Sequence, residues 1–152
     1  GRTLLLVGAG GAARGVLHAL LGAGPQQLVI ANRTAEKARQ LAFAFAGYGP
    51  VEAVGLDRLS GCHYDLVVNA TSASLSGEMP PLPDVLFAAN ALAYDMMYGD
   101  EPTVFMQWAE GHGAGQVSDG LGMLVEQAAA SFYLWNEIKP QTEEVIRLVR
   151  QM

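Results

Sequence analysis

Short apolar runs alternate along the chain with longer stretches in which apolar residues recur every three or four positions. A continuous run such as 3–7 is typical of a strand buried on both faces of a parallel sheet, whereas the wider spacing is typical of a helix. The pattern predicts strands at residues 3–7, 28–31, 51–54, 66–69, 91–95 and 115–118. It predicts helices at 12–21, 35–46, 103–111, 120–135 and 142–151, and a loop at 72–84.

Strands that alternate with helices imply right-handed βαβ units. We therefore expect an α/β fold: a Rossmann-like, doubly wound parallel sheet of about six strands with flanking helices. A length of 152 residues, 51% of them hydrophobic, is enough for one packed domain over residues 1–152 and excludes a disordered chain. The chain opens on Gly1, Arg2 and Thr3 and enters an apolar run at once, so we expect a piece of a longer polypeptide.

Charge and cysteine content narrow the function classes. The formal net charge of −6 disfavours a nucleic-acid-binding surface, although it allows a local cationic pocket. We expect no membrane association, because the longest apolar stretch, 85–93, is far shorter than the roughly 20 residues that span a bilayer. The single cysteine, Cys62, excludes an internal disulfide framework and favours a reducing, cytoplasmic location.

A glycine-rich segment follows the first predicted strand and opens the first predicted helix. Residues 8–13 fit the pattern G-x-G-x-x-G/A, through Gly8, Gly10, Gly11, Ala12 and Ala13. Gly8 allows a tight turn, Gly10 lets a pyrophosphate approach the backbone, and Ala13 is small enough for the helix to pack on the strand. Because the helix N-terminus presents unpaired N–H groups to phosphates, the segment predicts a dinucleotide site. An ordinary glycine turn is the alternative.

The end of the second predicted strand indicates which dinucleotide binds. An NAD site usually places an acidic residue here to bind the ribose 2′-hydroxyl, but this chain has Asn32. Arg33, Thr34 and Lys37 follow, and all three can bind a 2′-phosphate. The segment therefore predicts NADP(H) as the cofactor. The alternative is a solvated, capped helix start.

Seven short sequence features follow one another along the chain. They are residues 8–14 (GAGGAAR), 32–34 (NRT), 69–72 (NATS), 94–96 (YDM), 119–124 (DGLGML), 127–129 (QAA) and Trp135. Together they resemble the C-terminal half of shikimate dehydrogenase, and the resemblance covers essentially the whole chain. It implies a reversible NADP(H)-linked reduction of 3-dehydroshikimate to shikimate, in aromatic amino-acid biosynthesis.

The resemblance also implies roles for individual residues. It places Asn69, Ala70, Thr71 and Ser72 near the cofactor, and it brings Met96 and Gly120 toward the nicotinamide. Tyr98 and Gln127 would reach the hydroxyl groups of the substrate. Since Gln127 lies among apolar helix residues, we expect a buried amide that needs hydrogen-bond partners, and a polyhydroxylated ring would supply them.

The resemblance implies a further N-terminal domain that holds most of the substrate and contributes a catalytic Lys and Asp. Their motifs do not occur in this chain, so no catalytic residue is predicted here, and the fragment alone is expected to be inactive. Asp95 and Asp119 are expected to cap helices or to form structural hydrogen bonds. The histidines show no metal or triad spacing, so no metal site is predicted.

Two alternative functions stay open. One is a non-catalytic NADP-binding sensor or partner module. The other is the quinate/shikimate dehydrogenase branch of the family, which also accepts NAD. The helices within residues 120–152 would return toward the missing domain, which leaves their apolar residues partly exposed or used in a self-contact. Either a monomer or a homodimer is compatible with the sequence.

Overall fold

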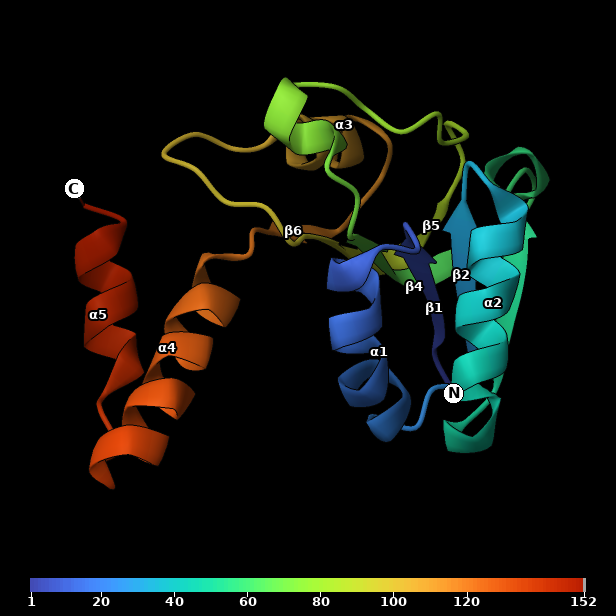
Figure 1. Cartoon of the computed structure of the whole chain (residues 1–152). Helices are drawn as coiled ribbons and strands as arrows, with labels where there is room; N and C mark the ends of the chain where they lie inside the picture. Colours follow the sequence, from blue (N-terminus) through green and yellow to red (C-terminus); the bar gives the residue numbers. More distant parts are fainter. Residues whose placement is uncertain (152) are drawn as a thin grey trace.

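The computed structural model describes residues 1–151 and shows a six-stranded, all-parallel sheet (Figure 1). The strand order is β3-β2-β1-β4-β5-β6, the order of a Rossmann fold. The expected α/β, doubly wound sheet is therefore confirmed. The strands are β1 (Thr3–Val7), β2 (Gln27–Asn32), β3 (Val51–Gly55), β4 (Tyr64–Asn69), β5 (Phe87–Asp95) and β6 (Gln116–Ser118).

Helices and short 3-10 turns connect the strands. The α-helices are α1 (Gly11–Gly22), α2 (Ala35–Phe45), α3 (Val104–Gly111), α4 (Leu121–Asn136) and α5 (Thr142–Val149). The 3-10 turns are η1 (Ala46–Tyr48), η2 (Leu56–Arg58) and η3 (Ala73–Ser76). Each predicted helix exists, with ends within two residues of the predicted ones; Met152 lies outside the described residues.

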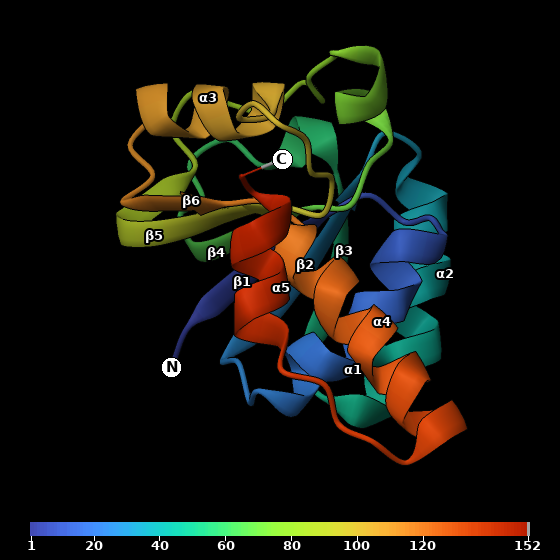
Figure 2. The ribbon, with the colours of Figure 1, turned by 90° about the vertical axis from the view of Figure 1, so that its left-hand side faces the viewer.

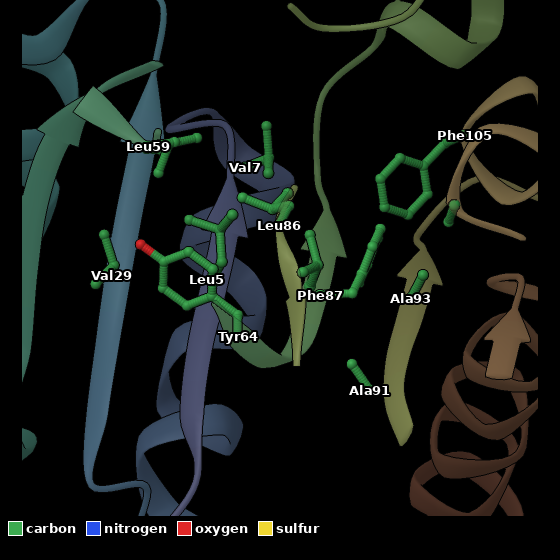
Figure 3. Packing of buried hydrophobic residues seen from close by; sticks show 13 residues of the cluster. Leu5, Val7, Val29, Leu59, Tyr64, Leu86, Phe87, Ala91, Ala93 and Phe105 are labelled. Atoms are coloured by element: carbon green, nitrogen blue, oxygen red, sulfur yellow. The ribbon is translucent and has the colours of Figure 1, made fainter. Parts of the chain in front are cut away.

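The sheet separates two hydrophobic cores. On one face, α1 and α2 cover the side chains of Leu4, Leu6 and Ile30. On the other face, Leu5 and Val7 pack with Phe105 of α3 and with the connecting segments, as Figure 3 shows. Because alternate residues of β1 point to opposite cores, the strand is apolar throughout, which explains the continuous run in the sequence.

One strand begins earlier than its hydrophobic pattern predicts. β5 starts at Phe87, which pairs with Tyr64 of β4, whereas the sequence indicates a start at Ala91. Asn90 has a left-handed backbone with φ of 61° and is exposed, so it interrupts the apolar run inside the strand. The strand register shifts at the same place, between Tyr64 and Leu66.

The last two helices stand at one end of the molecule. Figure 2 shows α5 running beside α4 and ending near the loops at the carboxyl edge of the sheet. The pair exposes Leu134, Trp135 and Leu148, and α5 contains no buried residue among those described. The expected partial exposure of the closing helix is confirmed. Within residues 1–151, no helix combines the length and the apolar character that crossing a membrane requires.

Candidate functional site

A cleft of about 660 Å³ opens at the carboxyl edge of the sheet, above the ends of β1 and β2. Its size falls within the range typical of cofactor sites. Nine of the residues predicted to bind the cofactor line it: Gly8, Gly10, Gly11, Ala12, Asn32, Arg33, Ala70, Thr71 and Ser72. The cleft lies where strand order reverses between β1 and β4, which is where open α/β sheets bind ligands.

The glycine turn between β1 and α1 has the geometry that its sequence predicts. Gly8 has φ of 110°, a backbone conformation that favours glycine, and a Cβ there would lie 3.0 Å from the carbonyl oxygen of Ala70. Both the backbone conformation and this close contact disfavour a side chain. Gly10 is the N-cap of α1, and a Cβ on it would meet only open space. Ala13 is fully buried against the sheet.

The N-terminus of α1 is suited to an anion. No side chain caps this end of the helix, and its first turn contains no acidic residue. The first N–H groups therefore have no partner from a capping side chain and carry the positive end of the helix dipole. They open into the cleft together with Gly10, Gly11 and Ala12, so the residues present fit a pyrophosphate.

The turn after β2 forms one end of the cleft. The Asn32 side-chain amide donates a hydrogen bond to the Thr34 carbonyl at 3.0 Å, which fixes the turn that carries Arg33. Arg33 is exposed and lines the cleft, and Lys37 is exposed on the first turn of α2. Thr34 is the N-cap residue, but its side chain makes no capping bond. Glu36, the acidic residue here, pairs with Arg39 at 3.1 Å.

The end of β4 forms the opposite wall. Asn69 is fully buried, so it supports the wall, while the following residues Ala70, Thr71 and Ser72 line the cleft. The Asn69 side-chain amide donates to the Asp95 carboxylate at 3.2 Å, and its oxygen accepts from the Thr71 hydroxyl at 2.8 Å. Asn69 thus links the end of β4 to the end of β5.

Asp95 holds several segments together at this edge. Its fully buried carboxylate accepts hydrogen bonds from the Ser74 hydroxyl at 2.8 Å and the Thr103 hydroxyl at 2.7 Å. It also accepts one from the backbone N–H of Met97 at 3.1 Å. Thr103 in turn caps α3 through the N–H of Met106. The expected structural role of Asp95 is confirmed.

The loop after β4 supplies lining residues that no motif in the sequence indicates. Met79, Pro80 and Pro81 line the cleft from this loop, and Leu56 and Met97 contribute from elsewhere. The Ser, Gly and Pro content of residues 72–84 predicted a loop, but it gave no signal of where the loop would fold. The two prolines limit the freedom of this wall.

A second tight contact lies beside the cleft, after β6. The backbone N–H of Gly120 donates to the carbonyl of Met97 at 2.9 Å, and a Cβ at position 120 would collide with the carbonyl of Met96. Neither Met96 nor Gly120 is among the lining residues, but Met97 is. Burial raises the pKa of Tyr94 on β5, and the negative charge of Asp119 adds to this effect.

Two predicted substrate residues lie on the surface. Tyr98 is exposed, and Gln127 is exposed on α4. The expectation of a buried Gln127 amide is therefore wrong, because α4 does not bring this side chain against the sheet.

The guanidinium of Arg14 lies 5.7 Å from the centre of the Phe45 ring, which is a surface contact. The described part of the chain contains no group of three or more residues able to hold a metal ion.

Comparisons with known proteins match both ends of the chain to one family. The sequence profile described as Shikimate / quinate 5-dehydrogenase matches residues 1–76, which is half of the chain. The profile described as Shikimate 5′-dehydrogenase C-terminal domain matches residues 120–150.

Individual relatives agree with these profiles. A shikimate dehydrogenase (NADP(+)) from Cellvibrio japonicus is 58% identical over 99% of this chain and 55% of its own length. The crystal structure of an Ael1 enzyme from Pseudomonas putida matches with a TM-score of 0.87 and 46% identity, covering 97% of this chain and 54% of that one. Shikimate 5-dehydrogenase from Thermus thermophilus, solved with NADP(H) and shikimate, gives 0.80 and 34% over the same shares. The chain spans about half the length of the curated relatives it matches.

Proposed function

The chain belongs to the shikimate / quinate 5-dehydrogenase family, and on this basis we propose that it is the NADP(H)-binding part of a shikimate dehydrogenase. The parent enzyme would reversibly reduce 3-dehydroshikimate to shikimate. The proposal rests on one observation above all: the cleft joins an open helix N-terminus to Arg33, with no acidic residue at position 32.

Each part of the cleft has a role in this proposal. The N–H groups at the start of α1 would hold the pyrophosphate, and Arg33 would pair with the 2′-phosphate through its planar fork. Met97 and the neighbouring Gly120 turn would border the nicotinamide at the other end of the cleft. The proposed cofactor residues are Gly8, Gly10, Gly11, Ala12, Ala13, Asn32, Arg33, Thr34, Lys37, Asn69, Ala70, Thr71, Ser72, Met96 and Gly120.

The bound NADP(H) would supply the hydride chemistry of the reaction. This chain would place the nicotinamide and exclude water from one of its faces, with Met79 and the two prolines that follow it as apolar cover. Tyr98 and Gln127 are both exposed and therefore accessible to a substrate. We assign them to the substrate hydroxyl groups on the family motifs that they match.

The remaining half of the enzyme would complete the site. Relatives are almost twice as long as this chain, and α4 and α5 expose a broad apolar face. We propose that residues 1–152 act as one NADP-binding domain and that the helices within residues 120–152 pack on a substrate domain that supplies the catalytic Lys and Asp. The parent enzyme would be cytoplasmic and either a monomer or a homodimer.

Arg33→Ala tests the cofactor assignment. We expect NADPH affinity, measured by the fluorescence of the bound nucleotide, to fall about tenfold or more, because a charge-assisted pair with the 2′-phosphate is lost. NADH affinity should change less than twofold. Arg2→Ala is the matched control, since Arg2 is exposed before β1 at the opposite edge of the sheet. Equal losses for the two nucleotides would contradict the NADP assignment.

Reconstitution tests the activity. The chain alone should not reduce NADP with shikimate, whereas a mixture with a separately produced N-terminal half should do so. Activity of the chain alone would contradict the proposal that this chain binds the cofactor while a separate domain supplies the catalytic residues. If NADPH binds but no partner half restores turnover, the non-catalytic NADP-binding module becomes the better assignment. Preference for quinate and NAD in the mixture would assign the chain to the other branch of the family.

A further inference from the structure

An ion pair connects the end of the chain to the loop after β6. Both nitrogens at the tip of Arg150 donate to the carboxylate of Asp119, at 3.1 Å and 2.6 Å, in the parallel arrangement that suits a guanidinium. The side chain of Asp119 is 6% exposed, whereas that of Arg150 is 49% exposed. The hydrogen bonds to Asp119 raise the pKa of Arg150.

The same carboxylate also organises the start of α4. One oxygen of Asp119 accepts a hydrogen bond from the backbone N–H of Leu121 at 3.2 Å. The residue between them, Gly120, donates its N–H to the carbonyl of Met97. Asp119 thus connects Arg150 to the start of α4, on either side of the Gly120 turn that packs on residues 96 and 97.

The turn lies next to the cleft at the end far from the 2′-phosphate site. Arg33 lines one end of the cleft and Met97 lines it from the end of β5. A dinucleotide whose 2′-phosphate lies at Arg33 must therefore extend its other ring toward Met97. The contacts form a continuous path from Arg150 through Asp119 and Gly120 to this end of the cleft.

We propose that Arg150 is a positioning residue whose ion pair with Asp119 holds the Gly120 turn, and through it the backbone of Met97, in place for the nicotinamide end of the cofactor. The proposal deepens the NADP-binding function and rests on it. Arg150 touches neither the cleft nor any residue of the glycine turn, so its effect would be transmitted entirely through Asp119.

Apart from this ion pair, the side-chain hydrogen bond that α5 makes to another element runs to α4, where the Thr142 hydroxyl donates to Glu126 at 2.6 Å. α4 buries only Leu121 and Val125, and α5 has no buried residue among those described. Figure 1 shows α5 farther from the sheet than α4, and Figure 2 shows its final turn directed toward the carboxyl edge of the sheet. Arg147, one turn earlier on α5, makes only an exposed contact of 3.9 Å with Glu144. Arg150 therefore joins the end of α5 to Asp119, in the loop beside the cleft.

The test compares NADPH with 2′,5′-ADP, which carries the 2′-phosphate but no nicotinamide. Arg150→Ala should lower NADPH affinity about threefold to tenfold, the range of a coupling carried by a partly exposed pair, and change 2′,5′-ADP affinity less than twofold. Asp119→Asn should have the same effect, because it removes the ion pair but keeps an acceptor for Leu121. Arg150→Lys should recover part of the affinity, and Arg147→Ala should change neither affinity.

The possible results separate the two proposals. A wild-type chain that binds neither nucleotide would overturn the NADP-binding function, and with it this role. If 2′,5′-ADP binds normally but Arg150→Ala leaves NADPH affinity unchanged, or lowers both affinities equally, the positioning role alone is overturned. The amide NMR signals of Gly120 and Met97 give a second readout without nucleotide: they should shift in Arg150→Ala, and unchanged signals would also overturn it.

Discussion

Removing the carboxylate of Asp95 should destabilise the carboxyl edge of the sheet, because four hydrogen bonds from different segments converge on it. The hydroxyl donors of Ser74 and Thr103 can turn to other acceptors, but the backbone N–H of Met97 cannot, and the Asn69 amide would keep only its second hydrogen bond, to the Ser74 hydroxyl at 3.2 Å. A hydrogen bond to a charged group contributes about 1.5–3 kcal/mol. Asp95→Ala removes the charged acceptor of the Met97 N–H and of the Asn69 amide at a fully buried side chain. It should therefore lower the free energy of unfolding by about 3–5 kcal/mol.

Urea unfolding followed by circular dichroism measures this loss. With a slope of about 2 kcal/mol per M, the midpoint should fall by about 1.5–2.5 M. Asp95→Asn keeps one acceptor oxygen and should lose roughly half as much. Ser76→Ala is the control, because Ser76 is exposed and donates only to a neighbouring carbonyl. An Asp95→Ala midpoint within about 0.5 M of the wild type would refute the reasoning, because it would mean that the buried carboxylate contributes little.

Further predictions concern backbone and charge. Gly8→Ala should destabilise the fold by about 1–3 kcal/mol, because alanine is strained at the positive φ of this position. The same variant should weaken NADPH binding in a fluorescence titration. Gly15→Ala is the control: a Cβ on this α1 residue would meet only open space, so the substitution should raise the free energy of unfolding by about 0.5–1 kcal/mol. The N–H and hydroxyl of Thr3 donate to Asp65 and lower its pKa. The stability that Asp65 contributes is therefore present above its unfolded pKa and lost as pH falls through the lower, folded pKa. Asp65→Asn should destabilise the protein at pH 7, and its difference from the wild type in urea unfolding should disappear in acid; a constant difference would argue against the linkage.

The sequence predicted those parts of the site whose signals are local. The glycine turn needs only residues 8–13, because the strand, the turn and the helix start are consecutive in the chain. The choice of NADP similarly depends on Asn32 and Arg33, which are neighbours. The parallel, doubly wound sheet followed from the rule that βαβ units are right-handed, and it did not require side-chain contacts.

The parts that the sequence could not predict depend on contacts between distant segments. Asp119 and Arg150 are 31 residues apart, and Asn69 and Asp95 are 26 apart, so no local pattern relates either pair. The placement of Met79 in the cleft depends on how a whole loop folds back. Gln127 was predicted to be buried because its neighbours are apolar, but α4 is apolar on several faces and only Leu121 and Val125 of it are buried.

The contrast between the two ends of the chain supports the division of function that we propose. The proposed cofactor residues lie on elements anchored in the core: Ala13 of α1 and Val7 of β1 are both inaccessible to solvent. The proposed substrate residues Tyr98 and Gln127 lie on exposed surface, and Gln127 shares its helix with the exposed Trp135. A rigid scaffold can orient a cofactor by itself, whereas precise orientation of a substrate requires contacts on its other side. In the proposed division, the cofactor half of the site would be organised within this chain, and the substrate half would be completed by a surface that covers α4 and α5.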